Sequence, residues 1–179
     1  YQGYRQMFEA MRQAGTPHLL RIWNYLPRIN EDGGGLERYR QFNVGRQRAF
    51  VDAGLGVLEG APAACALGLH RGGLSIRFLA GRSAPVAVEN PRQVSAYRYP
   101  TDYGPRPPLF SRAALADLGG GQVALFISGT ASIVGHASVH LGDVAGQTRE
   151  TLRNLQAVVD ASHRHGTARY TLDGLHLVV

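Results

Sequence analysis

The sequence predicts an α+β fold, on three observations. Tyr4, Phe8 and Met11 fall on one helical face, whereas residues 19–29 alternate large apolar side chains as a strand does. Glycine and proline separate these and the later apolar runs. With 179 residues, 44% of them hydrophobic, the chain can form one globular domain or two small halves of a duplicated architecture.

The first third of the chain alternates helix, strand and helix. We expect a helix over about residues 1–14, ended by Gly15 and Pro17, and then the strand over residues 19–29. Asp32 and the three glycines after it favour a turn into a second helix. The candidate core residues of that helix are Leu36, Tyr39, Phe42, Phe50 and Val51.

The middle of the chain predicts a strand pair and a long loop. Residues 63–69 and 74–80 are apolar, and the His-Arg-Gly-Gly sequence between them favours a turn that joins them as neighbours. Residues 81–91, with two prolines, are expected to be a connector. Residues 94–112 contain four prolines, which predicts a long ordered loop, the kind of segment where binding groups concentrate.

Residues 125–154 carry the stretch around which the rest is organised. The apolar run 123–127 predicts a buried strand that opens into Ser-Gly-Thr-Ala-Ser at 128–132. Small side chains and glycine let a ligand approach the backbone closely, so this loop predicts a pocket.

A capped helix and a last strand are expected next. Gly142 and Asp143 predict a turn and an N-cap. The apolar face of the helix is expected to consist of Leu152, Leu155, Val158 and Val159. Residues 168–179 carry another strand pattern. Because the chain starts inside a helical pattern without methionine and stops inside this apolar run, we expect a fragment that lacks both termini.

The charge pattern favours a small anionic ligand. The 19 Lys+Arg residues against 13 Asp+Glu give a formal charge of +6, and all of these cations are arginines. They are scattered, which argues against a nucleic-acid partner, and arginine binds a carboxylate through two parallel hydrogen bonds. The single cysteine, Cys65, indicates a reducing compartment, and no apolar run reaches membrane-spanning length. We therefore expect a cytoplasmic protein without a membrane partner.

Four stretches together resemble the chorismatase family. They are Phe-Asn-Val-Gly-Arg-Gln at 42–47, Tyr-Gly-Pro-Arg-Pro-Pro-Leu-Phe-Ser-Arg-Ala at 103–113, Ser-Gly-Thr-Ala-Ser-Ile-Val-Gly-His at 128–136, and Gly-Asp-Val-Ala-Gly-Gln-Thr-Arg-Glu-Thr-Leu-Arg-Asn at 142–154. The start of the last stretch also resembles the wider RidA (YjgF) superfamily.

The resemblance implies a RidA-like (chorismate-mutase-like) fold with mixed sheets, helices packed on one face and two pseudo-repeated halves. Residues 1–83 are then the C-terminal part of a first unit, and residues 84–179 the N-terminal part of a second unit that carries the substrate pocket. A short echo supports such a repeat: the helices at Tyr4 and at Thr148 are each followed by a glycine and a strand pattern.

The same resemblance implies an enzyme that removes the enolpyruvyl group of chorismate as pyruvate, without a cofactor. The ring product is a dihydroxycyclohexadiene carboxylate, 3-hydroxybenzoate or 4-hydroxybenzoate. The glutamate that donates the initiating proton is expected beyond Val179, so the catalytic residue is unknown. A RidA-like imine or enamine deaminase and a non-catalytic small-molecule-binding module remain alternatives, and an oligomer is possible.

The candidate binding residues follow from the two carboxylates of that substrate. Arg106 and Arg112 are the preferred carboxylate ligands, with Arg46 as a weaker third. Tyr103 can donate its hydroxyl, and His136 can contact the substrate. The pocket floor is expected to consist of Gly129, Thr130 and Ala131. The structural alternatives are surface arginines, a packed aromatic ring, a tight strand end and a hydrogen-bonded histidine.

Three further polar residues are expected to have no catalytic part. His136 and His140 are four residues apart, but Gly135 argues against a helix there and no acidic or Cys ligand completes a set, so no metal is expected. Glu150 is expected to pair with the dipole of its helix. Cys65 is expected to be a core residue.

Overall fold

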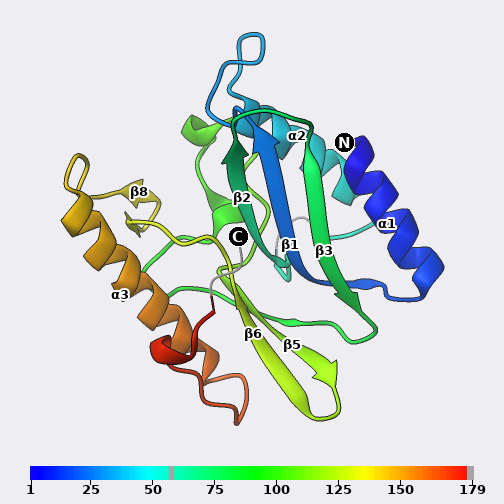
Figure 1. Cartoon of the computed structure of the whole chain (residues 1–179), viewed down its shortest axis with the longest axis vertical. Helices are drawn as coiled ribbons and strands as arrows, with labels where there is room; N and C mark the ends of the chain where they lie inside the picture. Colours follow the sequence, from blue (N-terminus) through cyan, green and yellow to red (C-terminus); the bar gives the residue numbers. More distant parts are fainter. Residues whose placement is uncertain (57–58, 177–179) are drawn as a thin grey trace.

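The computed structural model describes residues 1–56 and 59–176. Within these ranges the chain is an α+β protein with three α-helices, two three-stranded sheets and a short two-stranded ribbon (Figure 1). This confirms the predicted fold class. In the same ranges no helix combines the length and apolar character that crossing a membrane requires.

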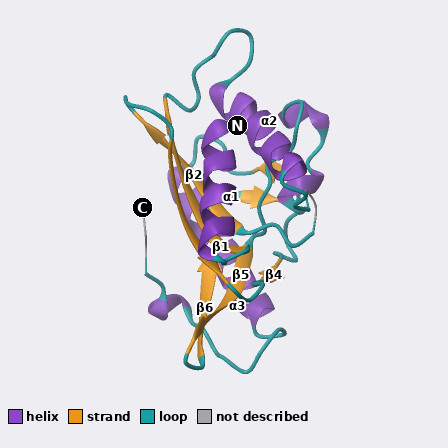
Figure 2. Ribbon diagram, turned by 90° about the vertical axis from the view of Figure 1, so that its right-hand side faces the viewer, coloured by secondary structure: helices purple, strands orange, loops and turns teal. Residues whose placement is uncertain are grey.

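The first sheet has the order β2-β1-β3. It consists of β2 (Ala63–Leu69), β1 (His18–Pro27) and β3 (Ser75–Gly81), and β1 runs parallel to β2 and antiparallel to β3. The helices α1 (Gln2–Ala14) and α2 (Arg38–Asp52) lie on the same side of this sheet (Figure 2). The predictions of α1, β1 and α2 are confirmed.

The expected pairing of residues 63–69 with residues 74–80 is wrong, although both segments are strands. β1 lies between them, because α2 acts as the crossover that a parallel pair of strands requires. The segment after β2 then passes over the end of β1, where the Arg28 amide donates to the carbonyl oxygen of Leu69 at 2.7 Å. The turn at residues 70–73 therefore spans a strand instead of closing a hairpin.

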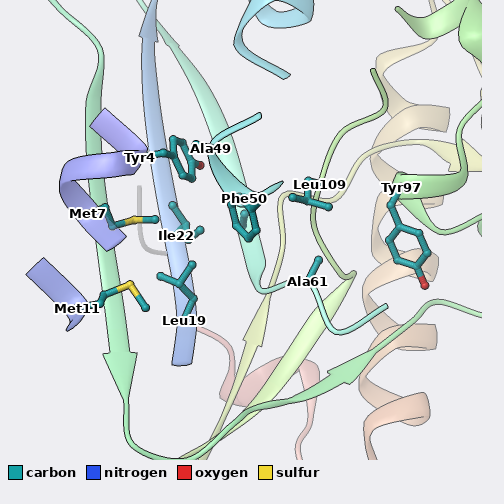
Figure 3. Packing of buried hydrophobic residues seen from close by; sticks show 11 residues of the cluster. Tyr4, Met7, Met11, Leu19, Ile22, Ala49, Phe50, Ala61, Tyr97 and Leu109 are labelled. Atoms are coloured by element: carbon teal, nitrogen blue, oxygen red, sulfur yellow. The ribbon is translucent and has the colours of Figure 1, made fainter. Parts of the chain in front are cut away.

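The first hydrophobic core lies between the first sheet and its two helices. Met7 and Met11 of α1 point toward Leu19 and Ile22 of β1 (Figure 3). The remaining buried members are Tyr4, Ala49, Phe50, Ala61, Ala64, Tyr97 and Leu109. Phe50 is 2% exposed, as predicted, but its neighbour Val51 is 57% exposed, so Val51 is not a core residue.

The second sheet is antiparallel, with the order β4-β5-β6. Its strands are β4 (Val86–Val88), β5 (Ala113–Gly119) and β6 (Gln122–Ile127), and only β6 was predicted as a strand. β4 lies inside the expected connector. β5 begins Ala-Ala-Leu-Ala and lacks β-branched residues, so its propensity for a strand is low; pairing with both neighbours defines it.

The helix α3 (Val144–Ser162) covers the second sheet. Asp143 caps it as predicted, since its Oδ1 accepts the amide of Gly146 at 2.9 Å. Val158 is buried against Val88, but Leu152 is 50% exposed, so part of the predicted apolar face is wrong. The polar residues Asn154 and Glu150 occupy the buried positions one turn and two turns before Val158, respectively.

The strand expected over residues 168–179 is wrong for its described part. Residues 168–176 contain one 3-10 turn (η3, Leu172–Gly174) and no strand, and the rest of this prediction lies outside the described residues. The Tyr170 hydroxyl donates to the carbonyl oxygen of Val123 at 2.9 Å, but no backbone ladder continues from this contact in the described residues. The strand pattern after α3 is therefore not matched by a paired strand in the described residues.

The two sheets meet beside the first residues of β2. Ala63 forms a parallel bridge with Ser111, just before β5, and the amide of Gly129, just after β6, donates to the carbonyl oxygen of Ala64 at 3.2 Å. The two loops on either side of the second sheet are thereby brought to the same region of the molecule.

Candidate functional site

Two loops meet beside the second sheet. We call residues 94–112 the tyrosine loop and residues 128–136 the glycine loop. The Val94 amide donates to the carbonyl oxygen of Gly135 at 2.8 Å, and the Gly135 amide donates to that of Arg92 at 2.9 Å. The tyrosine loop contains the 3-10 turns η1 (Ala96–Arg98) and η2 (Thr101–Tyr103), so it is ordered, as predicted.

An aromatic cluster joins the two loops. The hydroxyl of Tyr103 donates to the carbonyl oxygen of His136 at 2.7 Å and lies 3.1 Å from Nδ1 of that residue. The ring of Tyr99 lies 5.1 Å from that of Tyr103 and 6.4 Å from that of His136, between centroids. The structure thus brings two of the candidate residues together, with Tyr103 38% exposed, and adds Tyr99 to them.

Arg112 lies behind this cluster and is only 5% exposed. Its Nη2 donates to the carbonyl oxygen of Val94 and to the hydroxyl of Tyr99, both at 2.8 Å. The guanidinium also lies over the rings of Tyr99 and Phe110. Arg112 is therefore held in place by contacts within the protein. Because the Tyr99 hydroxyl oxygen accepts from Arg112, the positive charge polarises that hydroxyl, and its proton points away from Arg112.

Glu89, at the end of β4, is a buried carboxyl near Arg112. Both of its carboxylate oxygens are buried without a hydrogen-bond partner in the described residues. Burial raises the pKa of Glu89, and the charge of Arg112 only partly opposes that shift. Nε of Arg112 is also buried without a hydrogen-bond partner in the described residues. The opposite charges of Glu89 and Arg112 therefore stabilise each other in this buried region.

Arg106 has the opposite surroundings. It is exposed, two residues after Gly104, which lies against the side chain of Arg40 from α2. Among the described residues its guanidinium forms no ion pair within 4.0 Å. Its donors are therefore available to an external carboxylate.

The structure does not bring Arg46 to the two loops. Its Nη2 donates to Oδ1 of Asn43 at 2.8 Å and its guanidinium lies over the ring of Phe42, both in its own helix. The residue is 2% exposed. Tyr4, which is hydrogen-bonded to Asn24 of β1 at 2.7 Å, is its neighbour on α1. Arg46 thus belongs to a polar part of the first core.

The backbone of the glycine loop is engaged within the protein. The Gly129 amide donates to Ala64, and the carbonyl oxygen of Ala131 accepts from the side chain of Asn154 at 2.9 Å. The hydroxyl of Thr130 donates to the carbonyl oxygen of Ser128 at 2.9 Å. Gly129 and Ala131 are themselves exposed, so they can contact a ligand through their surfaces but not through these backbone groups.

Glu150 is the centre of a buried ionic network on α3, not a partner of the helix dipole. It lies in the second turn, its side chain is 4% exposed, and it is hydrogen-bonded to Arg92 and to Nη1 of Arg153, the latter at 3.1 Å. The dipole acts within the first turn, so that interpretation is wrong. The network instead joins α3 to the segment that precedes the tyrosine loop.

Acid is expected to remove the contribution of Glu150 to stability. Burial opposes its ionisation, but the hydrogen bonds and charges of Arg92 and Arg153 outweigh that effect, so the pKa of Glu150 is lowered. The stabilisation is then present above the ordinary carboxyl pKa of about 4.3 and is lost as the pH falls through the folded-state pKa. Urea unfolding should show E150Q to be less stable than the parent at pH 7, with a difference that shrinks below about pH 4.

The exposed pair of Arg28 and Glu31, 3.4 Å apart, offers a matched control. E31Q should leave the urea midpoint nearly unchanged at both pH values, because exposed ion pairs contribute little. A pH-independent loss in E150Q would contradict the assignment, since it would mean that shape and not charge is responsible.

Four residues near the loops were not identified from the sequence: Tyr99, Arg92, Glu89 and Asn154. Tyr99 stands in Tyr-Arg-Tyr-Pro, where aromatic and arginine residues alternate, and this was a usable signal. The other three are single polar residues whose importance comes from burial. In the described ranges no group of three or more His, Cys, Asp or Glu side chains is arranged to hold a metal ion. Cys65 is half-buried, and burial raises the pKa of its thiol.

Comparison with known proteins agrees with the resemblance seen in the sequence. The family model described as "Chorismatase FkbO/Hyg5-like, N-terminal" matches residues 1–80. A chorismatase from Streptomyces hygroscopicus is 45% identical over 171 residues, which are 93% of this chain and 49% of that protein. A 3-hydroxybenzoate synthase from the same organism is 43% identical over 167 residues, or 89% of this chain and 48% of that protein.

A solved structure agrees with this relationship. The crystal structure of a chorismatase superimposes with a TM-score of 0.86 at 43% sequence identity, and the match covers 94% of this chain and 51% of the other. The chain spans about half the length of the curated relatives it matches. The resemblance seen in the four sequence stretches is confirmed: over about nine-tenths of its length the chain is similar to the N-terminal half of chorismatase FkbO/Hyg5-like proteins.

Proposed function

We propose that this chain is part of a chorismatase-type enzyme that removes the enolpyruvyl group of chorismate as pyruvate. The observation that carries the proposal is the 43–45% identity to proteins described as chorismatases and as a 3-hydroxybenzoate synthase, over about nine-tenths of the chain. The ring product is a dihydroxycyclohexadiene carboxylate, 3-hydroxybenzoate or 4-hydroxybenzoate. The reaction needs no cofactor.

Cleavage of chorismate would require the residues of the two loops to bind its two carboxylates. Cleavage of the enol ether requires that both carboxylates are held while the methylene carbon is protonated and an oxocarbenium-like cation forms. Arg106 is exposed and suited to direct, two-point binding of one carboxylate. Tyr103 and His136 lie together at the surface of the adjoining cluster and would contact the ring hydroxyl or the other carboxylate.

Arg112 would support substrate binding indirectly, through Tyr99, and not by touching the substrate. Its Nη2 is already shared between Val94 and Tyr99, so its charge would act on the substrate through the Tyr99 hydroxyl. Gly129, Thr130 and Ala131 form the floor through their small surfaces. Arg46 has the least structural support among the proposed ligands, because its contacts are within the first core.

We also propose that the chain is composed of two pseudo-repeated parts, residues 1–83 and residues 84–179, each related to a RidA subunit. Each part has its own three-stranded sheet and its own helix or helices, and the buried cluster of the first part also takes in Tyr97 and Leu109 from the second. The boundary falls between β3 and β4, and the candidate binding loops lie in the second part. The proton-donating carboxyl is expected outside these residues.

Pyruvate release tests the proposal directly. The full-length protein is given chorismate, pyruvate is followed by a coupled lactate dehydrogenase assay, and the ring product is identified by chromatography. Pyruvate formed well above the spontaneous rate, with one of the three ring products in equal amount, supports the proposal. A folded protein that releases no pyruvate overturns it.

Arg106→Met is expected to lower kcat/KM for chorismate about 100-fold, because a charge-assisted pair with a carboxylate is lost. Arg106→Lys should recover only part of that loss, since an ammonium cannot form two parallel hydrogen bonds. Arg82, an exposed arginine in the connector between β3 and β4, supplies the control: R82M should leave kcat/KM unchanged. Equal kinetics for R106M and the parent would remove Arg106 from the site.

A further inference from the structure

Asn154 uses its side chain to hold the glycine loop. It lies on the inner face of α3 and is fully buried. Its Nδ2 donates to the carbonyl oxygens of Ala131 and Ile133, both at 2.9 Å, and its Oδ1 accepts from Nη1 of Arg92 at 3.0 Å. A side-chain amide nitrogen has two hydrogens, and Asn154 donates both of them to carbonyl oxygens of this loop.

The contacts extend from the loop to the segment that begins the tyrosine loop. The backbone carbonyl oxygen of Asn154 accepts from Nδ2 of Asn90 at 3.1 Å, and Arg92 is hydrogen-bonded to Glu150 one turn earlier on α3. The Gly135 amide in turn donates to the carbonyl oxygen of Arg92 at 2.9 Å. One buried asparagine thus joins α3 to both segments of the candidate site.

These bonds set the direction of the loop backbone. With two carbonyl oxygens two residues apart turned toward α3, the intervening peptide groups have little freedom to rotate. At its start the loop is held through Ser128 and Gly129, which are bonded to Ala64 of β2. Loss of the Asn154 donors would leave the Ala131 carbonyl oxygen without a side-chain donor and the Ile133 carbonyl oxygen with only Nε2 of Gln93, at 3.0 Å, so the middle of the loop would loosen while its start stays attached.

We propose that Asn154 is a positioning residue for substrate binding, acting through the glycine loop and not by touching the substrate. This inference rests on the proposed function, since it takes the glycine loop as the floor of the chorismate site. Because the loop forms a surface and supplies no reacting group, a displaced loop should raise KM more than it lowers kcat.

Asn154→Asp is the informative substitution. A carboxylate has nearly the same volume and keeps an acceptor for Arg92, but it has no donors and would face two carbonyl oxygens. The change therefore removes the two loop contacts while the contact between α3 and Arg92 persists. Ser162→Ala is the matched control, because Ser162 is buried on the same helix and its hydroxyl donates only within the helix, to Val159 at 2.6 Å.

Hydrogen–deuterium exchange of the full-length protein, without substrate, gives the first readout. The amides of Ile133, Gly135 and Val139 are hydrogen-bonded within or next to the loop and report on its order. N154D should speed their exchange about tenfold while amides of β1 and α1 keep their rates, and S162A should change none of them. Unchanged exchange at these amides, or an equal increase throughout the chain, would overturn the positioning role.

Kinetics with chorismate give the second readout. N154D should lower kcat/KM about 100-fold, mainly through KM, whereas S162A should not alter either constant. Unchanged kinetics in N154D together with a locally released loop would show that the loop does not position substrate. If the parent itself releases no pyruvate, the proposed function fails, and the exchange experiment still decides whether Asn154 orders the loop.

Discussion

Replacing Arg112 by methionine lowers the free energy of unfolding by an expected value of about 3 kcal/mol. The substitution leaves the partly buried Val94 carbonyl and Tyr99 hydroxyl without their shared donor. It also removes the cation that partly offsets the burial of Glu89, and it removes a planar group packed against Phe110. Urea unfolding followed by circular dichroism measures the effect.

Two further variants separate the causes of this loss. R106M, six residues earlier in the same loop, should stay within about 0.5 kcal/mol of the parent, because Arg106 is exposed. E89Q should cost less in the R112M background than in the parent background, since the buried negative charge is then already uncompensated. If R112M were as stable as R106M, Arg112 would not hold the tyrosine loop, and a direct substrate contact would be the better assignment.

Replacing Phe50 by alanine is expected to lower the free energy of unfolding by about 3–5 kcal/mol. The ring is 2% exposed and stands edge-on to that of Phe8, with centroids 5.0 Å apart. It also packs against Tyr4, at 5.9 Å between centroids. Deleting it leaves a cavity between α1, α2 and β1 that surrounding side chains can fill only in part (Figure 3).

The neighbouring residue provides the control for this prediction. Val51 follows Phe50 in α2 but is 57% exposed, so V51A should change the free energy of unfolding by no more than about 0.5 kcal/mol. Urea midpoints of the two variants decide the issue. Comparable losses in both would contradict the placement of α2 on the first sheet.

Features that depend on nearby residues could be predicted from the sequence. The α1 helix follows from the spacing of its apolar residues and ends at Gly15, whose φ of 64° suits glycine. Asp143 caps α3 through a residue three positions later. Helix hydrogen bonds and caps join residues a few positions apart, so a local pattern contains the necessary information. The family motifs were likewise visible as contiguous strings.

Features that depend on distant residues could not be predicted in this way. The order β2-β1-β3 arises because α2 carries the chain across the sheet, and no property of residues 63–80 reveals that β1 lies between the two strands. β5 is a strand because both of its neighbours pair with it, despite its alanine-rich start. Strand pairing joins separate segments, so it is decided only when the chain folds.

The candidate site shows the same division. The sequence by itself determined which loops carry arginine, tyrosine and small residues, and which family they indicate. The tertiary structure decided that Arg112 is buried behind Tyr99 whereas Arg106 is exposed. It also decided that the side-chain amide of Asn154 donates to the glycine loop. Burial and hydrogen-bond partners come from segments far away in the chain, and these determine whether a polar side chain is free to bind a ligand or is needed to hold the fold.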